Sequence, residues 1–382
     1  MATTAKLEVQ NGDLLQSVQA FLHMLMDDGG VAGLLTPLHM GPGVVMPALV
    51  SEPERLKQAD PLAPAFPLNA ARIAARLTRG GSPGGTLAAV LRPCEVRAFV
   101  ELVKLNQGNL EDLAIVSLDC LGAYTNADYR RFAAGRDPRE ASNKFATLAL
   151  AGRSQEPAGL DLAKACRACE RPVANNADIT VGLVGLRGGG HLLVSAHTPR
   201  GEALLAKLRL PDTDEPAGRK DALAELVNGR TAFRDEMFAA TRDATASMPK
   251  LADYLAACVG CYNCRAACPV CYCRECVFLT DVFDHKPWQY LGWAKGKSAL
   301  RLPTDTVLFH LTRLAHMSLS CVGCGQCSNA CPNDVPVMEL FRTVAARTQE
   351  AFAYEPGRSP DEPIPLSVFQ AKEFAEVTGG RD

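Results

Sequence analysis

Cysteine is the residue type in this sequence whose number and spacing point most directly to chemistry. Eight of the 15 cysteines lie in two copies of one pattern, C-x2-C-x2-C-x3-C-P. The first copy contains Cys258, Cys261, Cys264, Cys268 and Pro269, and the second contains Cys321, Cys324, Cys327, Cys331 and Pro332. Three thiolates at this spacing can wrap one 4Fe-4S cluster, while the fourth points away toward a second cluster. The pattern therefore predicts two clusters.

The predicted ligand sets follow from this exchange of the fourth cysteine. Cluster 1 is predicted to be held by Cys258, Cys261, Cys264 and Cys331, and cluster 2 by Cys321, Cys324, Cys327 and Cys268. Disulfides and structural zinc are the alternatives. An odd number of cysteines argues against pure disulfide pairing, and zinc ligands usually come as paired C-x2-C units with longer gaps.

Four further cysteines are the right number for a third 4Fe-4S cluster, here called cluster 3: Cys94, Cys120, Cys166 and Cys169. The apolar runs 87–91 and 113–118 are predicted strands, with a predicted helix at 95–104 between them. Such a unit forms a right-handed crossover in a parallel sheet. Cys94 and Cys120 would then follow the ends of two strands about 5 Å apart, if these are neighbours. The alternative is that both are small buried side chains.

A crowded trio of cysteines, Cys271, Cys273 and Cys276, follows the first motif. Its spacing is too dense for core packing to explain. The trio either holds a further metal centre, completed by another side chain or a partner subunit, or lies beside a cluster and tunes it. His310 and His316 precede the second motif on a predicted helix and could be ligands or proton carriers, although a helix histidine is more often packed or solvated.

The candidate cofactor-binding residues are the glycines of a loop that precedes the run 87–91, namely Gly80, Gly81, Gly84 and Gly85. Such a loop can cradle a phosphate group, but it more often serves as a plain turn. The sequence has no clear G-x-G-x-x-G fingerprint of a dinucleotide site.

The composition excludes several classes of protein. The chain has 382 residues, of which 47% are hydrophobic, and a formal net charge of -2. Neither lysine nor arginine forms a long run, so we expect no nucleic-acid partner. No apolar stretch approaches the roughly 20 residues that span a bilayer, and the N-terminus lacks a basic segment followed by an apolar one. We therefore expect a cytoplasmic protein with no membrane span.

The pattern of predicted elements indicates an α/β N-terminal domain that contains a parallel sheet, followed by an α-helical dicluster ferredoxin domain. The predicted parts are the α/β domain at 1–215, a helical linker at 216–250, the ferredoxin domain at 251–345 and an extended C-terminal arm at 346–382. The proline-rich stretch 47–67 is predicted to be a surface connection around a short helix at 52–57.

Four features occur in an order that resembles a known family: Ala89-Val-Leu-Arg-Pro-Cys-Glu95, a strand ending in Cys120, Cys166-x2-Cys169 and Ala177-Asp-Ile-Thr-Val-Gly182. They are similar, over roughly residues 10–210, to the beta subunit of deazaflavin (coenzyme F420) hydrogenases and formate dehydrogenases. Residues 250–345 resemble, roughly, the helical ferredoxin domain of heterodisulfide reductase and succinate dehydrogenase iron–sulfur subunits.

The resemblance implies FAD and one 4Fe-4S cluster in the sheet domain. It also implies an iron–sulfur electron-transfer subunit of a multisubunit oxidoreductase, whose catalytic centre lies on a partner of the formate dehydrogenase or hydrogenase type. The alternative is a flavin-free electron wire or docking subunit that works with a heterodisulfide-reductase-like flavoprotein. The missing dinucleotide fingerprint favours this alternative, whereas the beta-subunit-like sheet domain favours a flavin.

Overall fold

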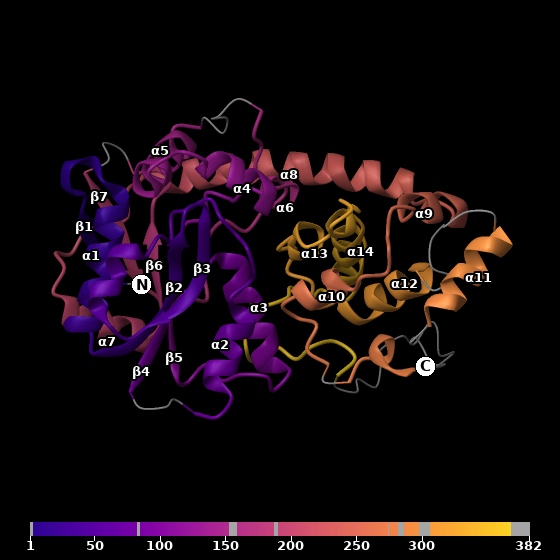
Figure 1. Ribbon diagram of the computed structural model, residues 1–382. Coiled ribbons are helices and arrows are strands. Elements are labelled where there is room, and N and C mark those ends of the chain that lie inside the picture. The colour runs from indigo at the N-terminus through magenta and orange to yellow at the C-terminus, as the bar shows by residue number, and fades with distance from the viewer. Residues whose placement is uncertain are drawn as a thin grey trace, which may run out of the picture.

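The computed structural model describes residues 3–81, 85–152, 159–186, 190–273, 275–281, 286–297 and 306–367. A mixed sheet with its covering helices forms one end of the molecule, and a set of shorter helices forms the other (Figure 1). The long helix α8, Gly218–Ala244, extends from the sheet end of the molecule to the helical end. The expected combination of an α/β domain and a helical domain is confirmed.

Seven strands form one sheet in the order β1-β7-β6-β5-β4-β2-β3. Their bounds are β1 Thr3–Glu8, β2 Val31–Gly41, β3 Val44–Val50, β4 Thr86–Val90, β5 Leu113–Leu118, β6 Ile179–Gly182 and β7 His191–Ala196. The four central strands β2, β4, β5 and β6 are parallel. The strands at the two edges, β3 on one side and β7 and β1 on the other, join by antiparallel pairing. The carboxyl ends of β4 and β5 therefore lie side by side, at the same end of the parallel strands.

The helices form two groups, one that precedes α8 along the chain and one that follows it. In the first group are α1 Leu14–Asp27, α2 Ala71–Thr78, α3 Pro93–Lys104, α4 Asn126–Ala133, α5 Pro138–Leu150, α6 Lys164–Arg167 and α7 Pro199–Leu208. After α8 come α9 Met248–Tyr254, α10 Asn263–Ala267, α11 Pro287–Lys297, α12 Thr306–Met317, α13 Gln326–Asn329 and α14 Val337–Ala351.

The two faces of the sheet bury two different cores because successive side chains of a strand point to opposite faces. Ala88 and Val116 belong to the core that contains the apolar sides of α1 and α7. Ala89 and Ile115 belong to a second core, which contains side chains of α2 and α3 and continues into the helical end through Phe309 and other residues of α12 and α14. The sheet and the helical end thus share one continuous core.

The stretch 47–67 differs from the prediction in two parts. The prediction that 47–67 is a surface connection is wrong for residues 47–50, because β3 extends to Val50 and pairs with β2. It is also wrong for residues 59–66, which are mostly buried. Pro37 of β2 and Pro47 of β3 lie opposite each other. A proline cannot donate to the ladder but is tolerated in an edge strand, and β3 is the last strand of the sheet. The expected short helix is a 3-10 helix at Pro53–Gln58.

The segment after α14 returns to the sheet domain and binds the buried carboxylate of Glu101 on α3. Glu101 Oε1 accepts hydrogen bonds from the Tyr354 hydroxyl at 2.6 Å and from the Gly357 amide at 2.8 Å. The Lys104 ammonium lies 3.2 Å from the same oxygen. The Glu101 side chain has no exposed surface, so this contact ties the end of the helical part to α3.

Among the described residues, none of the helices combines the length and the apolar character that crossing a bilayer requires.

Candidate iron–sulfur sites

Two predicted ligands stand where neighbouring parallel strands end. Cys94 lies in the first turn of α3, directly after β4, and Cys120 lies two residues after the end of β5. Pro93 suits the first helical position because its missing N–H would have no partner there. The Cys120 amide donates to Pro172 O at 2.8 Å, which brings the segment that follows Cys169 to the same place. The expected convergence of the strand ends is therefore present in the fold.

The third predicted quartet lines one cavity. The lining of this cavity includes Cys94, Cys120, Cys166, Cys169, Cys324, Arg92 and Arg230. Burial, together with the negative charges of Cys120 and Cys169, raises the pKa of the Cys166 thiol to about 12. Thiols in this setting become good ligands only when a metal supplies positive charge. Four soft sulfur donors around an enclosed space are the donor set that a 4Fe-4S cluster requires.

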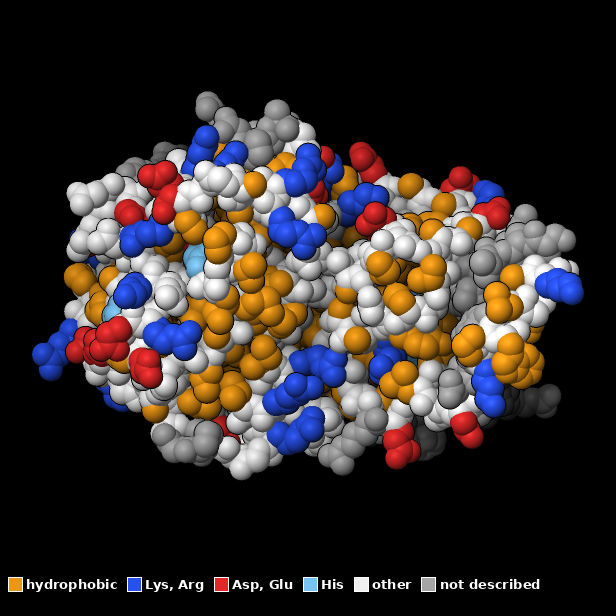
Figure 2. Space-filling model, in the orientation of Figure 1, with side chains coloured by type: hydrophobic (Ala, Val, Ile, Leu, Met, Phe, Trp, Pro, Cys, Tyr) orange, Lys and Arg blue, Asp and Glu red, His pale blue; other side chains and the backbone are white. Residues whose placement is uncertain are grey.

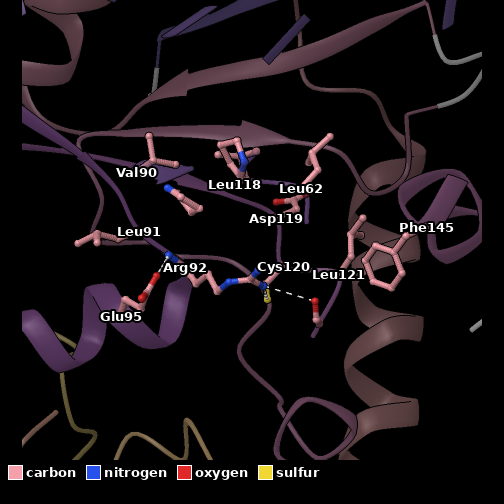
Figure 3. A pocket seen from close by; sticks show the side chains of 13 residues that line it. Leu62, Val90, Leu91, Arg92, Glu95, Leu118, Asp119, Cys120, Leu121 and Phe145 are labelled. Atoms are coloured by element: carbon pink, nitrogen blue, oxygen red, sulfur yellow. Dashed lines mark hydrogen bonds between the residues drawn. The ribbon is translucent and has the colours of Figure 1, made fainter. Parts of the chain in front are cut away.

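Arg92 closes one side of this cavity. Its guanidinium donates to the carbonyl oxygens of Ala63 and Ala65 at 2.8 and 2.9 Å, and its Nη1 lies 3.9 Å from Cys120 Sγ. Glu95 accepts a hydrogen bond from the Arg92 backbone N–H at 2.8 Å. Figure 3 shows Arg92 extending from the start of α3 toward Cys120. A fixed cation therefore lies beside the predicted ligands.

The two C-terminal motifs have the same backbone conformation. Gly260 and Tyr262 in the first motif have positive φ angles of 66° and 59°, and the equivalent residues Gly323 and Gly325 have 69° and 78°. These paired left-handed residues turn the chain back so that three cysteines of one motif can face a common centre. At Gly325 a Cβ atom would clash with Ala165 Cβ, so only glycine fits there.

Two cysteines have charged neighbours from both motifs. Burial raises the pKa of the Cys264 thiol; Arg313 opposes this, the charges of Cys258, Cys261 and Cys331 add to it, and the result is about 11. Burial also raises the pKa of Cys327 well above its usual value; Arg313 opposes this, and the charges of Cys268, Cys324 and Cys321 add to it. The ligand sets of clusters 1 and 2 stay a prediction.

Cys324 connects cluster 2 with the sheet domain. It lines the cavity of Cys94 and its partners. After burial, its charge is the largest cause of the raised pKa of the Cys94 thiol. The predicted sites for clusters 2 and 3 are therefore neighbours.

Two buried side chains of α12 touch the predicted ligands of cluster 1. Arg313 Nη1 donates to Cys264 Sγ at 3.1 Å, and His310 Nε2 lies 3.5 Å from Cys258 Sγ. Burial and then the Arg313 charge lower the pKa of His310 to about 4, so its imidazole is neutral near pH 7. His316 is exposed on the same helix. Of the two histidines that the sequence singled out, His310 is the one at a predicted cluster.

The cysteine trio follows the first motif along the chain. Cys271 is half-buried and has the charges of Cys268 and Cys273 beside it, while Cys273 is exposed. In the described part of the chain, no three cysteine, histidine, aspartate or glutamate side chains lie close enough together to hold a single metal ion. A further centre in the trio stays a prediction.

The glycine loop and these cysteines lie at opposite ends of the parallel strands. Gly80, Gly81 and Gly85 precede the amino end of β4, and Gly84 lies outside the described residues. Ligands of parallel sheets collect beyond the carboxyl ends of strands. Two hollows lie at that end instead. A small one is lined by Arg92, Asp119 and Cys120 (Figure 3), and a larger one, of about 800 Å³, lies between the end of β6, α5 and α8.

The chain has recognisable relatives. Residues 84–212 match the family described as the C terminus of the coenzyme F420 hydrogenase/dehydrogenase beta subunit, and residues 318–337 match a 4Fe-4S binding domain. The F420-dependent formate dehydrogenase subunit beta of Methanocaldococcus jannaschii is 26% identical over 295 residues, which is 71% of this chain and 73% of that protein. Subunit beta of F420-dependent formate dehydrogenase 1 of Methanococcus maripaludis is 25% identical over 392 residues, 94% of each chain.

The chain is therefore similar, over most of its length, to beta subunits of F420-dependent formate dehydrogenases. With its 4Fe-4S domain, it is an iron–sulfur electron-transfer subunit. A chain in the F420-reducing NiFe hydrogenase complex of Methanosarcina barkeri is also similar, with a TM-score of 0.44 and 15% identity, covering 65% of this chain and 94% of that one.

The matched segments contain the four cysteines predicted for cluster 3 and the four cysteines of the second motif. The beta-subunit match includes Cys94, Cys120, Cys166 and Cys169, and the 4Fe-4S match includes all four cysteines of the second motif. Sequence reasoning did not find Arg92, Arg230 or Arg313. Arg92 could have been noticed because it precedes Cys94 at the end of a predicted strand. The other two lie far along the chain from the cysteines they approach, and no local pattern marks them.

Proposed function

We propose that this chain is a cytoplasmic relay of three 4Fe-4S clusters, which pass single electrons in the order cluster 3, cluster 2, cluster 1 or in reverse. The observation that supports this order is the position of Cys324, which belongs to the second motif and also lines the cavity of the sheet-domain quartet. The exchange of the fourth cysteine between the motifs supports the step between clusters 2 and 1. We divide the chain accordingly into a sheet domain at 1–215, a linker at 216–250, a ferredoxin domain at 251–345 and a C-terminal segment at 346–382. The expected extended arm is wrong for residues 346–351, which complete α14.

The protein supplies fixed ligands and a dry environment for these clusters. The potential of a cluster depends on net charge, hydrogen bonds to sulfur and solvent exposure. The cysteines assigned to cluster 2 are all half-buried, whereas Cys261 of cluster 1 is exposed. Cluster 1 is therefore the end of the relay at which a partner approaches.

The surface around cluster 1 supports a docking role. Several large apolar side chains in this part of the chain are exposed: Val259, Val277, Leu279, Trp288, Leu291, Leu308 and Leu311. Figure 2 shows hydrophobic side chains exposed over α11 at this end of the molecule. Large exposed apolar patches mark protein interfaces. We assign this patch to a catalytic partner of the formate dehydrogenase or hydrogenase type, which would exchange electrons with cluster 1 through the region of Cys261.

A flavin would complete the opposite end of the relay. The cleft of about 800 Å³ lies within the volume range of cofactor sites, and its lining includes Leu183, Gly185 and Leu226, which suit a flat apolar ring. Arg230 lines both this cleft and the cavity of cluster 3. Bound there, FAD would split a two-electron exchange with a soluble carrier into single-electron steps. Arg230 would then lie between the flavin in this cleft and cluster 3.

The deciding experiment is an anaerobic count of iron, sulfide and acid-released flavin per chain. Three clusters predict about 12 irons, at four per cluster, and the Cys94→Ala variant is expected to retain about 8. A wild-type count near 8, or an unchanged count in the variant, would remove cluster 3. A count above 12 that falls in Cys273→Ala would assign iron to the trio. An acid extract without flavin absorbance would favour the flavin-free wire, and a colourless, iron-poor protein would overturn the proposal.

A further inference from the structure

Arg313 is a buried cation that has no carboxylate partner among the described residues. It lies on α12 and is 3% exposed. Its Nη1 donates to Cys264 Sγ at 3.1 Å, its Nη2 donates to Cys264 O at 3.3 Å, and its Nε is buried without a hydrogen-bond partner in the described part of the chain. A buried charge is normally paired. Within the described ranges, the groups whose negative charge most favours the Arg313 cation are cysteine sulfurs.

These sulfurs come from both motifs. The charges that favour the guanidinium cation are those of Cys264, Cys268, Cys327 and Cys271, in that order. Cys264 is assigned to cluster 1, whereas Cys268 and Cys327 are assigned to cluster 2. Arg313 therefore lies near cysteines that are assigned to both predicted clusters.

Aromatic rings hold the guanidinium in this place. It lies 4.6 Å from the centre of the Phe341 ring and 5.6 Å from that of Phe309. Both rings are almost fully buried. They keep water away from the cation, so its charge is weakly screened. The same packing restricts the side chain, and the charge stays at a constant distance from both sulfur groups.

We propose that Arg313 is a positioning residue whose fixed positive charge is shared by clusters 1 and 2 and raises the reduction potential of both. The inference rests on the proposed function, since it requires both clusters. Reduction adds one negative charge to a cluster, and a buried cation nearby stabilises the reduced form. Because the cation faces both clusters, it also offsets the repulsion between two reduced neighbours. Both can then accept electrons within a narrow range of potential.

The geometry distinguishes the two clusters. Cluster 1 receives a direct hydrogen bond from Arg313 to Cys264 Sγ as well as the charge, whereas cluster 2 receives the charge alone. Lysine keeps the charge but does not reproduce the planar guanidinium with its several donors. The Arg313→Lys variant should therefore affect cluster 1 more than cluster 2, while Arg313→Gln should affect both.

The test is a redox titration of the full-length, anaerobically purified protein, followed by electron paramagnetic resonance, with iron counted for each variant. Arg313→Gln is expected to lower the equilibrium constant for one-electron reduction of two of the three clusters about tenfold or more, which corresponds to a 59 mV decrease for each tenfold. The third signal should not move. Arg131→Gln, at an arginine with 65% side-chain exposure, is the matched control and should change none.

Three outcomes separate this inference from the proposed function. If Arg313→Gln retains its iron and every constant stays within threefold of the wild type, the shared-cation role is wrong and the relay stands. If the wild type lacks the clusters, the relay itself fails. If Arg313→Gln loses iron, Arg313→Lys decides, and a cluster-1 constant in that variant equal to the wild-type value would overturn the inference.

Discussion

The buried ion pair between Asp119 and Arg219 allows a test of what holds the carboxyl ends of β5 and β6 against α8. Asp119 lies between the end of β5 and Cys120, and its side chain has no exposed surface. Its carboxylate accepts two hydrogen bonds from Arg219 of α8, at 2.6 and 2.9 Å, and two from the amides of Leu183 and Val184, at 2.8 and 2.9 Å. One side chain thus joins β5, the end of β6 and α8.

Removing this carboxylate should be costly because Arg219, with 5% side-chain exposure, would keep, among the described residues, only the exposed carboxylate of Glu215, at 3.3 Å, as an ion-pair partner. Breaking one partner of a buried pair costs about 3–5 kcal/mol. Replacing both partners by apolar side chains, in Asp119→Leu with Arg219→Met, removes the buried charge. The amides of Leu183 and Val184 would still lack a partner, at about 1–3 kcal/mol. The double variant should therefore be more stable than Asp119→Ala but less stable than the wild type.

Urea unfolding under anaerobic conditions, followed by far-ultraviolet circular dichroism, measures these differences when the transitions have equal slopes. Asp235→Ala is the matched control, because it breaks an exposed pair with Arg234 and should cost less than about 1 kcal/mol. An Asp119→Ala variant within about 1 kcal/mol of the wild type would refute the reasoning. A double variant no more stable than the single one would also refute it.

Two further predictions concern the ends of the chain. Glu101→Ala should lower the free energy of unfolding by about 2–4 kcal/mol, since it leaves Lys104 and the Tyr354 hydroxyl buried without their acceptor; urea unfolding measures this, and cleavage after α14 by a protease should become faster. Asp13 caps α1 and bonds Arg139, and these contacts lower its carboxyl pKa although partial burial opposes them. A lowered pKa stabilises the fold above the unfolded value and loses this contribution as pH falls through the folded value, so the destabilisation by Asp13→Asn should be present at pH 7 and shrink below about pH 4; an equal difference at about pH 3 would contradict this.

The ligand groups can be predicted from the sequence because cysteine spacing is a local signal. The surroundings of the ligands are not local. Arg313 lies 49 residues from Cys264, and only the docking of α12 against α10 and α14 brings them together. The neighbourhood of Cys324 and Cys94 depends on how the helical part packs against the sheet. No spacing rule contains that information, and for this reason the proposed order of the clusters could not be inferred from the sequence.

The wrong prediction at β3 has a related cause. Proline at position 47 favours a loop in a local reading, but an edge strand needs no hydrogen bond from that residue. Tyr262 and Gly325 occupy equivalent positions in the two motifs, but their surroundings differ. Both have a left-handed backbone, yet the first position carries a tyrosine, whose ring packs on Phe309 with centroids 4.6 Å apart. The second is crowded by Ala165 and admits only glycine.

The return of the chain from α14 to Glu101 has a consequence for electron flow between the two halves. The rate at which an electron crosses a gap falls steeply as the gap widens, so a flexible joint between cofactors would make transfer erratic. Here the segment that contains Tyr354 and Gly357 clamps the halves together, and their apolar interiors are continuous. In the proposed relay, the fold itself would therefore fix the distances between the clusters, and electron transfer would be controlled by what binds at the two ends of the relay.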